Sequence, residues 1–106
     1  MPEDSPDTRL VPLLLDPTRL RVVATLLAAG EVEFAFVRDR VGLSDSALSK
    51  QVKALSDAGV VTSRREPHGP ARRTWLRLSP DGRRQVEVHV GALRDIAGGA
   101  DGSGSG

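Results

Sequence analysis

The sequence contains no cysteine and no tyrosine, and its only aromatic residues are two phenylalanines and one tryptophan. The absence of cysteine excludes disulfide bonds, thiol catalysis and cysteine-based zinc sites. No apolar run approaches the roughly 20 residues of a membrane-spanning helix. The acidic start MPEDSPDTR also lacks the apolar segment of a secretory signal. We therefore expect a cytoplasmic protein without a membrane partner, and a chain of 106 residues predicts one domain with one core.

Charge is distributed unevenly along the chain. The formal net charge is only +1, a value that by itself indicates no nucleic-acid partner. Residues 44–84, however, carry nine basic side chains against four acidic ones, whereas residues 1–16 carry one basic against four acidic. A negatively charged partner is therefore expected to bind the segment 44–84.

Three helices are predicted in the first half of the chain. The first begins at Asp16, an N-cap followed by proline, and ends at Gly30. A shorter one lies within residues 31–42, and a third runs from the cap Ser44 to Gly59. The second and third are joined by a short turn that contains glycine, which is the helix-turn-helix arrangement.

The helix predicted over residues 44–58 has two contrasting sides. Leu48, Val52 and Leu55 recur at helical spacing and predict the buried side. The other side carries serines, alanines and two lysines, without the glutamate–lysine pairs that a merely solvated face would carry. Such a lean face suits close approach to a large, negatively charged molecule.

In the second half of the chain, the spacing of apolar residues changes from the helical period to the alternation of strands. VVTSRRE and RRTWLRLS alternate apolar and polar residues, and they predict two strands joined by the turn-forming PHGPA. Ser79-Pro80 then begins a last helix. The predicted fold class is α+β, mainly α: a winged helix-turn-helix over residues 9–98, with a two-stranded wing and a C-terminal dimerisation helix. Residues 1–8 are predicted to be a flexible tail, and residues 99–106 a flexible tail or a cloning remnant.

Three segments also carry a resemblance. LDPTRLRVVATLL, LSDSALSKQVKALSDAGVV and RRTWLRLSPDGRR resemble winged helix-turn-helix transcriptional regulators related to the MarR and ArsR groups, in particular small stand-alone DNA-binding domains. The similarity covers about residues 13–97 and implies a regulator that binds DNA as a homodimer, with the C-terminal helix at the dimer interface. The chain departs from the family at Glu33, where a capping Ser or Thr is common, and at Gln51, where many relatives have His.

The DNA-binding prediction joins the helix 44–58 to the wing 64–73. The helix fits the major groove, and the residues near its start reach base edges. Gln51 either contacts adenine or packs at the edge of the core. The wing arginines either contact the backbone and the minor groove or are solvated strand residues that protect an edge. The predicted DNA-binding residues are Ser44, Ser46, Ala47, Ser49, Lys50, Gln51, Lys53, His68, Arg72 and Arg73.

The last helix has an apolar side longer than a domain of this size needs. It either packs on a partner helix, which we favour, or on the chain's own core. A two-fold dimer would place two recognition helices about 34 Å apart and would bind a pseudo-palindromic operator. The predicted interface residues are Leu13, Leu14, Val86, Val90, Leu93, Ile96 and Ala97.

Other classes of function find little support in the sequence. No glycine-rich phosphate loop is present, and neither histidine has a dyad partner at helical spacing, so no enzyme and no cofactor is predicted. His89 is expected beside the dimer seam rather than at a metal. A small-molecule effector is compatible with a dimer crevice lined by Trp75 or His89. The competing function is a winged-helix adaptor that binds protein instead of DNA.

Overall fold

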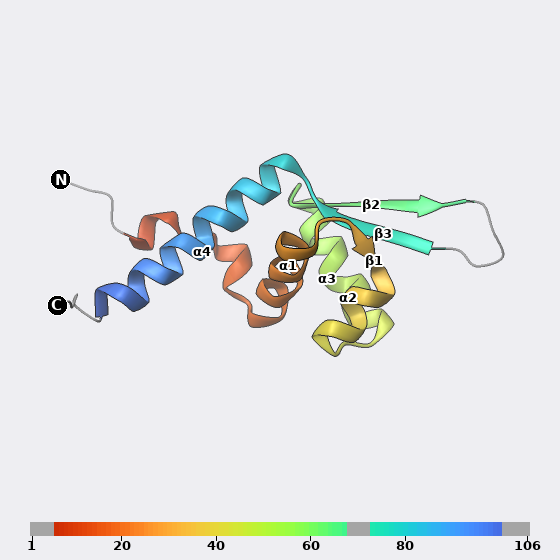
Figure 1. Ribbon diagram of the computed structural model, residues 1–106, viewed down its shortest axis with the longest axis horizontal. Coiled ribbons are helices and arrows are strands. Elements are labelled where there is room, and N and C mark those ends of the chain that lie inside the picture. Colours follow the sequence, from red (N-terminus) through yellow and green to blue (C-terminus); the bar gives the residue numbers. More distant parts are fainter. Residues whose placement is uncertain (1–5, 68–72, 101–106) are drawn as a thin grey trace.

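The computed structural model describes residues 6–67 and 73–100, except for the side chains of residues 99 and 100. Its elements are two short 3-10 helices (Pro6–Arg9 and Pro12–Leu15), α1 (Pro17–Ala29), β1 (Val32–Glu33), α2 (Phe34–Val41), α3 (Asp45–Asp57), β2 (Val61–Glu66), β3 (Arg73–Leu78) and α4 (Pro80–Ala100). Figure 1 shows an elongated molecule in which α4 extends at one end and the hairpin of β2 and β3 at the other. The predicted fold, mainly helical with a wing, is confirmed.

The helix-turn-helix is built from the predicted caps. The side chain of Ser44 accepts a hydrogen bond from the Ala47 N–H at 3.1 Å, which fixes the start of α3. Gly42 ends α2 in the left-handed conformation, with a φ of 81°. Its N–H donates to the Arg38 carbonyl at 2.9 Å. Because local hydrogen bonds fix both ends of the turn, they also fix the orientation of α3 relative to α2.

The sheet has one strand more than the sequence predicts. β2 and β3 form the predicted antiparallel hairpin, but β1 pairs with the other edge of β3, which gives the strand order β1-β3-β2. Val32 lies opposite Leu76 and Glu33 opposite Trp75. A strand of two residues shows no alternation, so its pairing with β3 is visible only in the tertiary structure.

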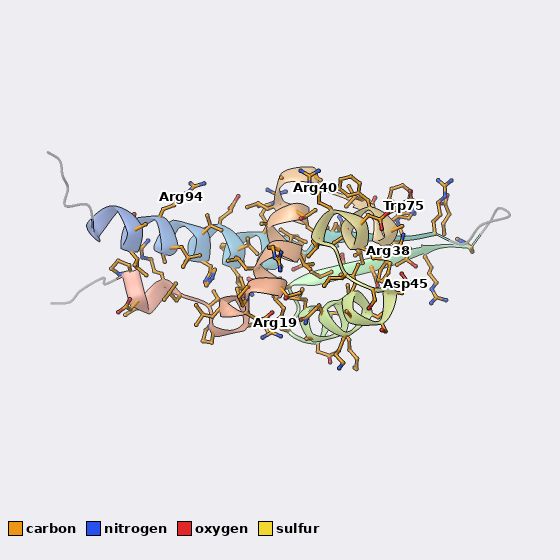
Figure 2. The ribbon with its side chains drawn as sticks, turned by 90° about the horizontal axis from the view of Figure 1, so that it is seen from below. Arg19, Arg38, Arg40, Asp45, Trp75 and Arg94 are labelled. Atoms are coloured by element: carbon orange, nitrogen blue, oxygen red, sulfur yellow. The ribbon has the colours of Figure 1, made fainter. Side chains whose placement is uncertain are left out.

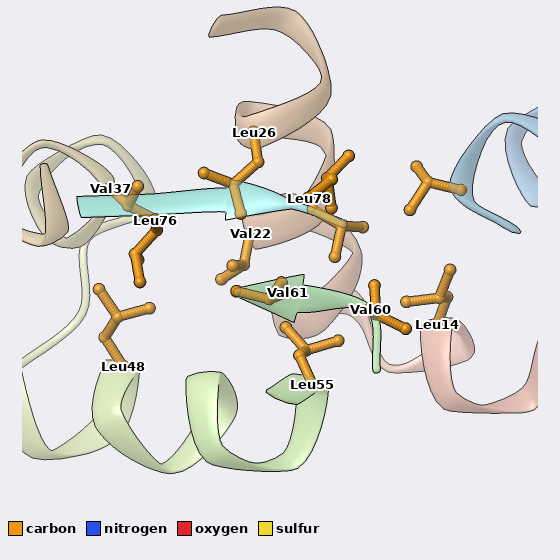
Figure 3. Close-up of a cluster of buried hydrophobic side chains, with 12 residues drawn as sticks. Leu14, Val22, Leu26, Val37, Leu48, Leu55, Val60, Val61, Leu76 and Leu78 are labelled. Atoms are coloured by element: carbon orange, nitrogen blue, oxygen red, sulfur yellow. The ribbon is translucent and has the colours of Figure 1, made fainter. Parts of the chain in front are cut away.

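The core lies between α3, the sheet and α1 (Figure 3). Leu48 and Leu55 of α3 are fully buried there, and Val52 packs against them partly buried, as the helical spacing predicts. The other fully buried core side chains include Val22, Val23 and Leu26 of α1, Val37 of α2, Val60 before β2, and Leu76 of β3. The inward side of α3 is thus used by the fold, which leaves its opposite side for a partner.

The described part of the N-terminal segment, from Pro6 onward, packs along α4, and residues 1–5 of the predicted tail lie outside the described residues. Pro6–Arg9 forms a 3-10 helix beside α4 (Figure 1). Arg9 forms an ion pair of 2.7 Å with Asp95, and the Val11 N–H donates to Nδ1 of His89 at 2.9 Å. This segment packs against α4. Because it contacts residues far away in the chain, its polar, proline-rich sequence does not predict this packing. At the other end, α4 continues to Ala100, into the predicted tail 99–106.

His89 is buried inside the chain, where the N-terminal segment contacts α4. It is 0% exposed, and its Nε2 has no hydrogen-bond partner within the described residues. Burial lowers the pKa of His89 from its ordinary value of 6.5, and the backbone of Leu14 opposes this in part. The bond from Val11 requires an unprotonated Nδ1, so the folded state holds the neutral imidazole.

The free energy of unfolding is expected to fall as the pH falls below about 6.5, the ordinary pKa of histidine. Because the folded pKa lies lower, the unfolded chain takes up the proton first, and stability is lost until the folded pKa is reached. Above pH 7 this group has no effect. Urea unfolding at pH 7.5, 6.5 and 5.5 measures the change.

The His89→Gln variant is the control, since its amide oxygen can accept the Val11 bond but does not titrate. Its urea midpoint is expected to vary much less over this pH range, although His68 is retained. An equal pH dependence in both proteins would show that His89 is not the group responsible.

Candidate nucleic-acid interface

The outward side of α3 is a ridge of small and basic side chains. With Leu48 and Leu55 facing the core, a rotation of about 100° per residue directs Ser46, Lys50 and Lys53 away from it. All three are exposed. Lys53 forms an ion pair of 3.2 Å with Asp57 one turn later, whereas Lys50 has no ion pair within the described part of the chain. Lys50 is thus the basic residue of this ridge that is available to a base or phosphate.

The start of α3 is shaped for close approach. Ser44 and Ser46 have their hydroxyl oxygens 3.4 Å apart, and both residues are exposed. Ala47 is half-buried behind them. All three side chains are short, so they allow a partner to approach the backbone closely. The N–H groups of a helix N-terminus also favour the binding of anions. These residues therefore form a surface that can enter a groove.

A groove of about 410 Å³ separates α3 from the wing. Ser49 and Lys53 line it from α3, and Ser63, Arg65 and Thr74 line it from the two strands. Arg65 is exposed and has no ion pair within the residues that the structure describes. The groove thus brings together lysine, arginine and hydroxyl groups, which are donors to phosphate oxygens.

The register of the strands decides which wing arginine faces α3. Val61 is buried, so alternation places Arg65 on the same face of β2 as Val61, toward α3. Arg64 points to the other face, where it pairs with Glu31 at 3.2 Å and stacks over Trp75. Arg65 is absent from the predicted site, because alternation separates it from Arg64 without showing which face of the hairpin meets α3.

The predicted wing residues have different outcomes. Arg73 lies on β3 and pairs with Glu33 of β1 at 3.4 Å, so its charge is partly compensated within the chain. His68 and Arg72 lie outside the described residues. Arg65 lines the groove beside Lys53 of α3, and Arg73 lines a separate hollow with Asp45 at the start of α3.

Gln51 adopts the second of its two predicted environments. It is half-buried at the edge of the core, on the side of α3 that faces α1. Its Oε1 accepts a hydrogen bond of 3.3 Å from Nη1 of Arg19. Arg19 is itself fixed by a bond of 2.7 Å to the Leu13 carbonyl. Gln51 therefore supports the packing of α3 on α1, and its oxygen is engaged within the chain.

An ion network joins α2 to the start of α3. Arg38 donates to Asp39 at 2.9 Å and to Asp45 at 2.8 Å. The bonds to Asp39 and to Asp45 raise the pKa of Arg38, and Arg38 in turn lowers the pKa of Asp39. The carboxylate of Asp45, the first residue of α3, is therefore paired with a guanidinium from α2.

The segment that forms this surface matches a known protein family. A family model described as "Winged helix DNA-binding domain" matches residues 18–97. The chain belongs to the winged helix DNA-binding domain family. The match includes nearly all of α1, all of α2 and α3, the hairpin and most of α4. No curated protein matches the sequence.

Solved structures share the fold of this winged helix domain. A transcriptional regulator homologue from Pyrococcus horikoshii OT3 superposes with a TM-score of 0.79 at 20% identity, covering 85% of this chain and 89% of that one. The PcaV transcriptional regulator from Streptomyces coelicolor, solved in complex with its natural ligand, gives 0.64 at 24% identity, with 89% and 67% covered. A MarR family transcriptional regulator from Silicibacter pomeroyi DSS gives 0.67 at 21%, with 79% and 56% covered. At these identities the three structures show that this chain shares their fold.

The predicted dimer residues of this winged helix domain are buried, half-buried or exposed within the chain. Leu14 and Val86 are fully buried in the chain's own core and present no surface to a partner, which corrects their assignment. Leu13, Val90 and Leu93 are not fully exposed either. Ile96 is 40% exposed and Ala97 is exposed as well. The chain's own core thus covers the first part of the apolar side of α4, and its last part is uncovered.

The described residues of the winged helix domain contain neither a membrane-spanning helix nor a cluster of metal-binding side chains. No helix among them is both long and apolar enough to cross a membrane. No group of three or more His, Asp or Glu side chains among residues 6–67 and 73–98 is arranged to hold a metal ion.

Proposed function

We propose that this winged helix domain is a sequence-specific transcriptional regulator that binds double-stranded DNA as a homodimer. Helix α3 lies in the major groove, and the wing contacts the backbone and the minor groove. The observation that carries the proposal is the outward side of α3, where Ser46 and Lys50 are exposed, together with the groove that Lys53 and Arg65 line. A helix with small residues at its start fits a major groove about 12 Å wide.

The charge of this surface supports binding to the DNA backbone. Lys50 and Arg65 have no ion pair within the described residues, and Lys53 is paired only with an exposed carboxylate. An exposed pair of this kind contributes little to stability, so Lys53 can exchange it for a phosphate. Phosphate contacts supply much of the affinity for DNA and make it salt-dependent.

The dimer rests on the uncovered part of α4. Ile96 belongs to the apolar side of α4 and is 40% exposed. Leu15, in the 3-10 helix Pro12–Leu15, is 53% exposed. Two copies related by a two-fold axis would bury these side chains and present two α3 helices to one face of the duplex.

Footprinting on the promoter region of its own gene tests the proposal. We expect two protected half-sites, related by a two-fold axis and separated by about 34 Å, one turn of duplex. We also expect affinity to fall steeply between 50 and 200 mM salt, on the order of 10³-fold. A single unrepeated half-site occupied by a monomer would contradict the dimer, while leaving DNA binding intact.

One observation favours the adaptor as a second function. Phe36 of α2 is 43% exposed, with Arg40 over its ring at 6.0 Å. It lines a hollow of about 300 Å³ with three alanines of α1. An exposed apolar patch of this kind suits a protein partner. Failure to bind any duplex at low salt in a gel-shift experiment would favour the adaptor over the regulator.

The proposal also accommodates a small-molecule effector. A hollow of about 430 Å³ opens where the wing meets α4, and Arg77 and Arg83 contribute to its lining. This volume falls in the range of small-molecule sites. Neither Trp75 nor His89, the residues predicted for an effector site, lines this hollow.

A further inference from the structure

We propose that Asp45 is a specificity-determining residue, which selects cytosine at one position of each half-site by accepting a hydrogen bond from the amino group of the base. Arg38 is its positioning residue. This inference rests on the proposed function, because it assigns a role within the same α3 surface.

The geometry leaves one oxygen of Asp45 free. Asp45 is the first residue of α3, directly after the cap Ser44, and its side chain is 73% exposed. Its Oδ1 accepts a bond of 2.8 Å from Nη1 of Arg38. Its Oδ2 has no partner within the described residues. Figure 2 shows the two side chains between the ends of α2 and α3. The carboxylate is therefore oriented, with its second oxygen available.

The charge of Asp45 would oppose DNA binding if it stood alone. A carboxylate near phosphates is repelled, and the effect is strongest where water is excluded. Arg38 offsets part of this charge, and it also donates to Asp39 at 2.9 Å. The chain thus retains an acidic group on a basic surface. A DNA-binding surface gains from such a group when the group contacts a base.

The chemistry of the major groove identifies the base. A carboxylate only accepts hydrogen bonds. Guanine and thymine present oxygen or nitrogen acceptors at their edges and would repel it. Adenine presents an amino group beside an acceptor nitrogen, whereas cytosine presents its amino group alone. Cytosine is therefore the base that suits Asp45.

A simpler role for Asp45 is to stabilise the positive N-terminus of α3. That role requires neither a fixed orientation nor a bond to α2, and it creates no base preference. Base preference therefore separates the two roles.

Selection of binding sites from a randomised duplex pool tests the proposal, with the full chain and its Asp45→Asn variant. The wild-type chain is expected to select cytosine at one position of each half-site, and replacing that C·G pair is expected to reduce affinity about tenfold. Asp45→Asn is expected to select adenine there, because asparagine forms two hydrogen bonds with adenine. Preferences at the other positions are expected to stay the same.

Asp57→Asn is the matched control, since it removes the same charge from the last turn of the same helix. It is expected to raise affinity slightly for all sites and to leave the selected sequence unchanged. If Asp45→Asn behaves in the same way, Asp45 acts only through its charge and the proposal is wrong. If the wild-type chain binds no duplex at low salt, the proposed function fails together with the inference.

Arg38→Met tests the positioning role. We expect it to reduce the discrimination between cytosine and the other bases about threefold to tenfold, and to have no effect on discrimination in the Asp45→Asn background. A purely structural role of Arg38 would weaken binding to all sites equally in both backgrounds, and that result would overturn its assignment. Thermal unfolding of each variant confirms that the fold is retained.

Discussion

Replacing Gly82 by alanine is expected to lower the free energy of unfolding by about 2–4 kcal/mol. Gly82 lies in the first turn of α4, against the backbone of Val60. A Cβ atom at this position would collide with the carbonyl oxygen of Val60 and lie 2.7 Å from its carbonyl carbon. These are backbone atoms, so the collision cannot be relieved by rotating a side chain.

The start of α4 cannot move away cheaply, because it is fixed to the end of the α3–β2 turn. The Ser79 N–H donates to the Val60 carbonyl at 2.9 Å, and its hydroxyl donates to the Gly59 carbonyl at 2.6 Å. The same hydroxyl accepts the Gly82 N–H at 2.8 Å. A shift of α4 would strain these three bonds. In the sequence SPDG (residues 79–82), Ser79 therefore caps α4, and Gly82 allows the helix to pack closely on the backbone of Val60.

Urea unfolding of Gly82→Ala and of Gly91→Ala measures the effect. Gly91 lies in the same helix, and a Cβ there would meet nothing within 4 Å. Gly91→Ala is therefore expected to raise the free energy of unfolding by up to about 1 kcal/mol, the helix propensity difference. Equal urea midpoints for Gly82→Ala and the wild type would show that α4 can be displaced without cost.

Replacing Lys50 and Arg65 together by alanine is expected to reduce affinity for a specific duplex about 100-fold. Lys50 stands on the outward ridge of α3, and Arg65 lines the groove between α3 and the wing. Neither is held by an ion pair within the described residues, so each can bond to DNA without breaking one. The salt dependence is expected to weaken by about one unit of slope for each phosphate that the variant no longer binds.

The matched control removes two positive charges elsewhere. Arg21 of α1 and Arg94 of α4 have no ion pair within the described residues. Arg94 lies on the part of α4 that extends away from the wing (Figure 2). The Arg21→Ala/Arg94→Ala variant is expected to bind within about threefold of the wild type. Equal losses of affinity in the two double variants, measured by fluorescence anisotropy, would contradict the assignment of Lys50 and Arg65.

Local signals predicted much of this fold. The side chain of Ser44 caps α3, Gly42 ends α2, and Leu48 and Leu55 are buried, because caps and helical spacing act within a few residues of the chain. The family membership agrees with the resemblance of the three segments. The wing arginines could not be ranked as reliably. Alternation separates Arg64 from Arg65, but it does not say which face of the hairpin meets α3.

The order of α1 to α4 and the hairpin, the side-chain caps of α1 and α3, and the basic outward side of α3 were determined by the sequence alone, because each depends on neighbours along one helix or strand. Only the tertiary structure decided that β1 pairs with β3, that the segment around Val11 covers His89, and that Arg38 holds Asp45. These contacts join residues whose meeting depends on how whole elements pack, and no local pattern specifies that packing. Which basic groups are already paired, and which remain available to a partner, therefore follows from the packed structure.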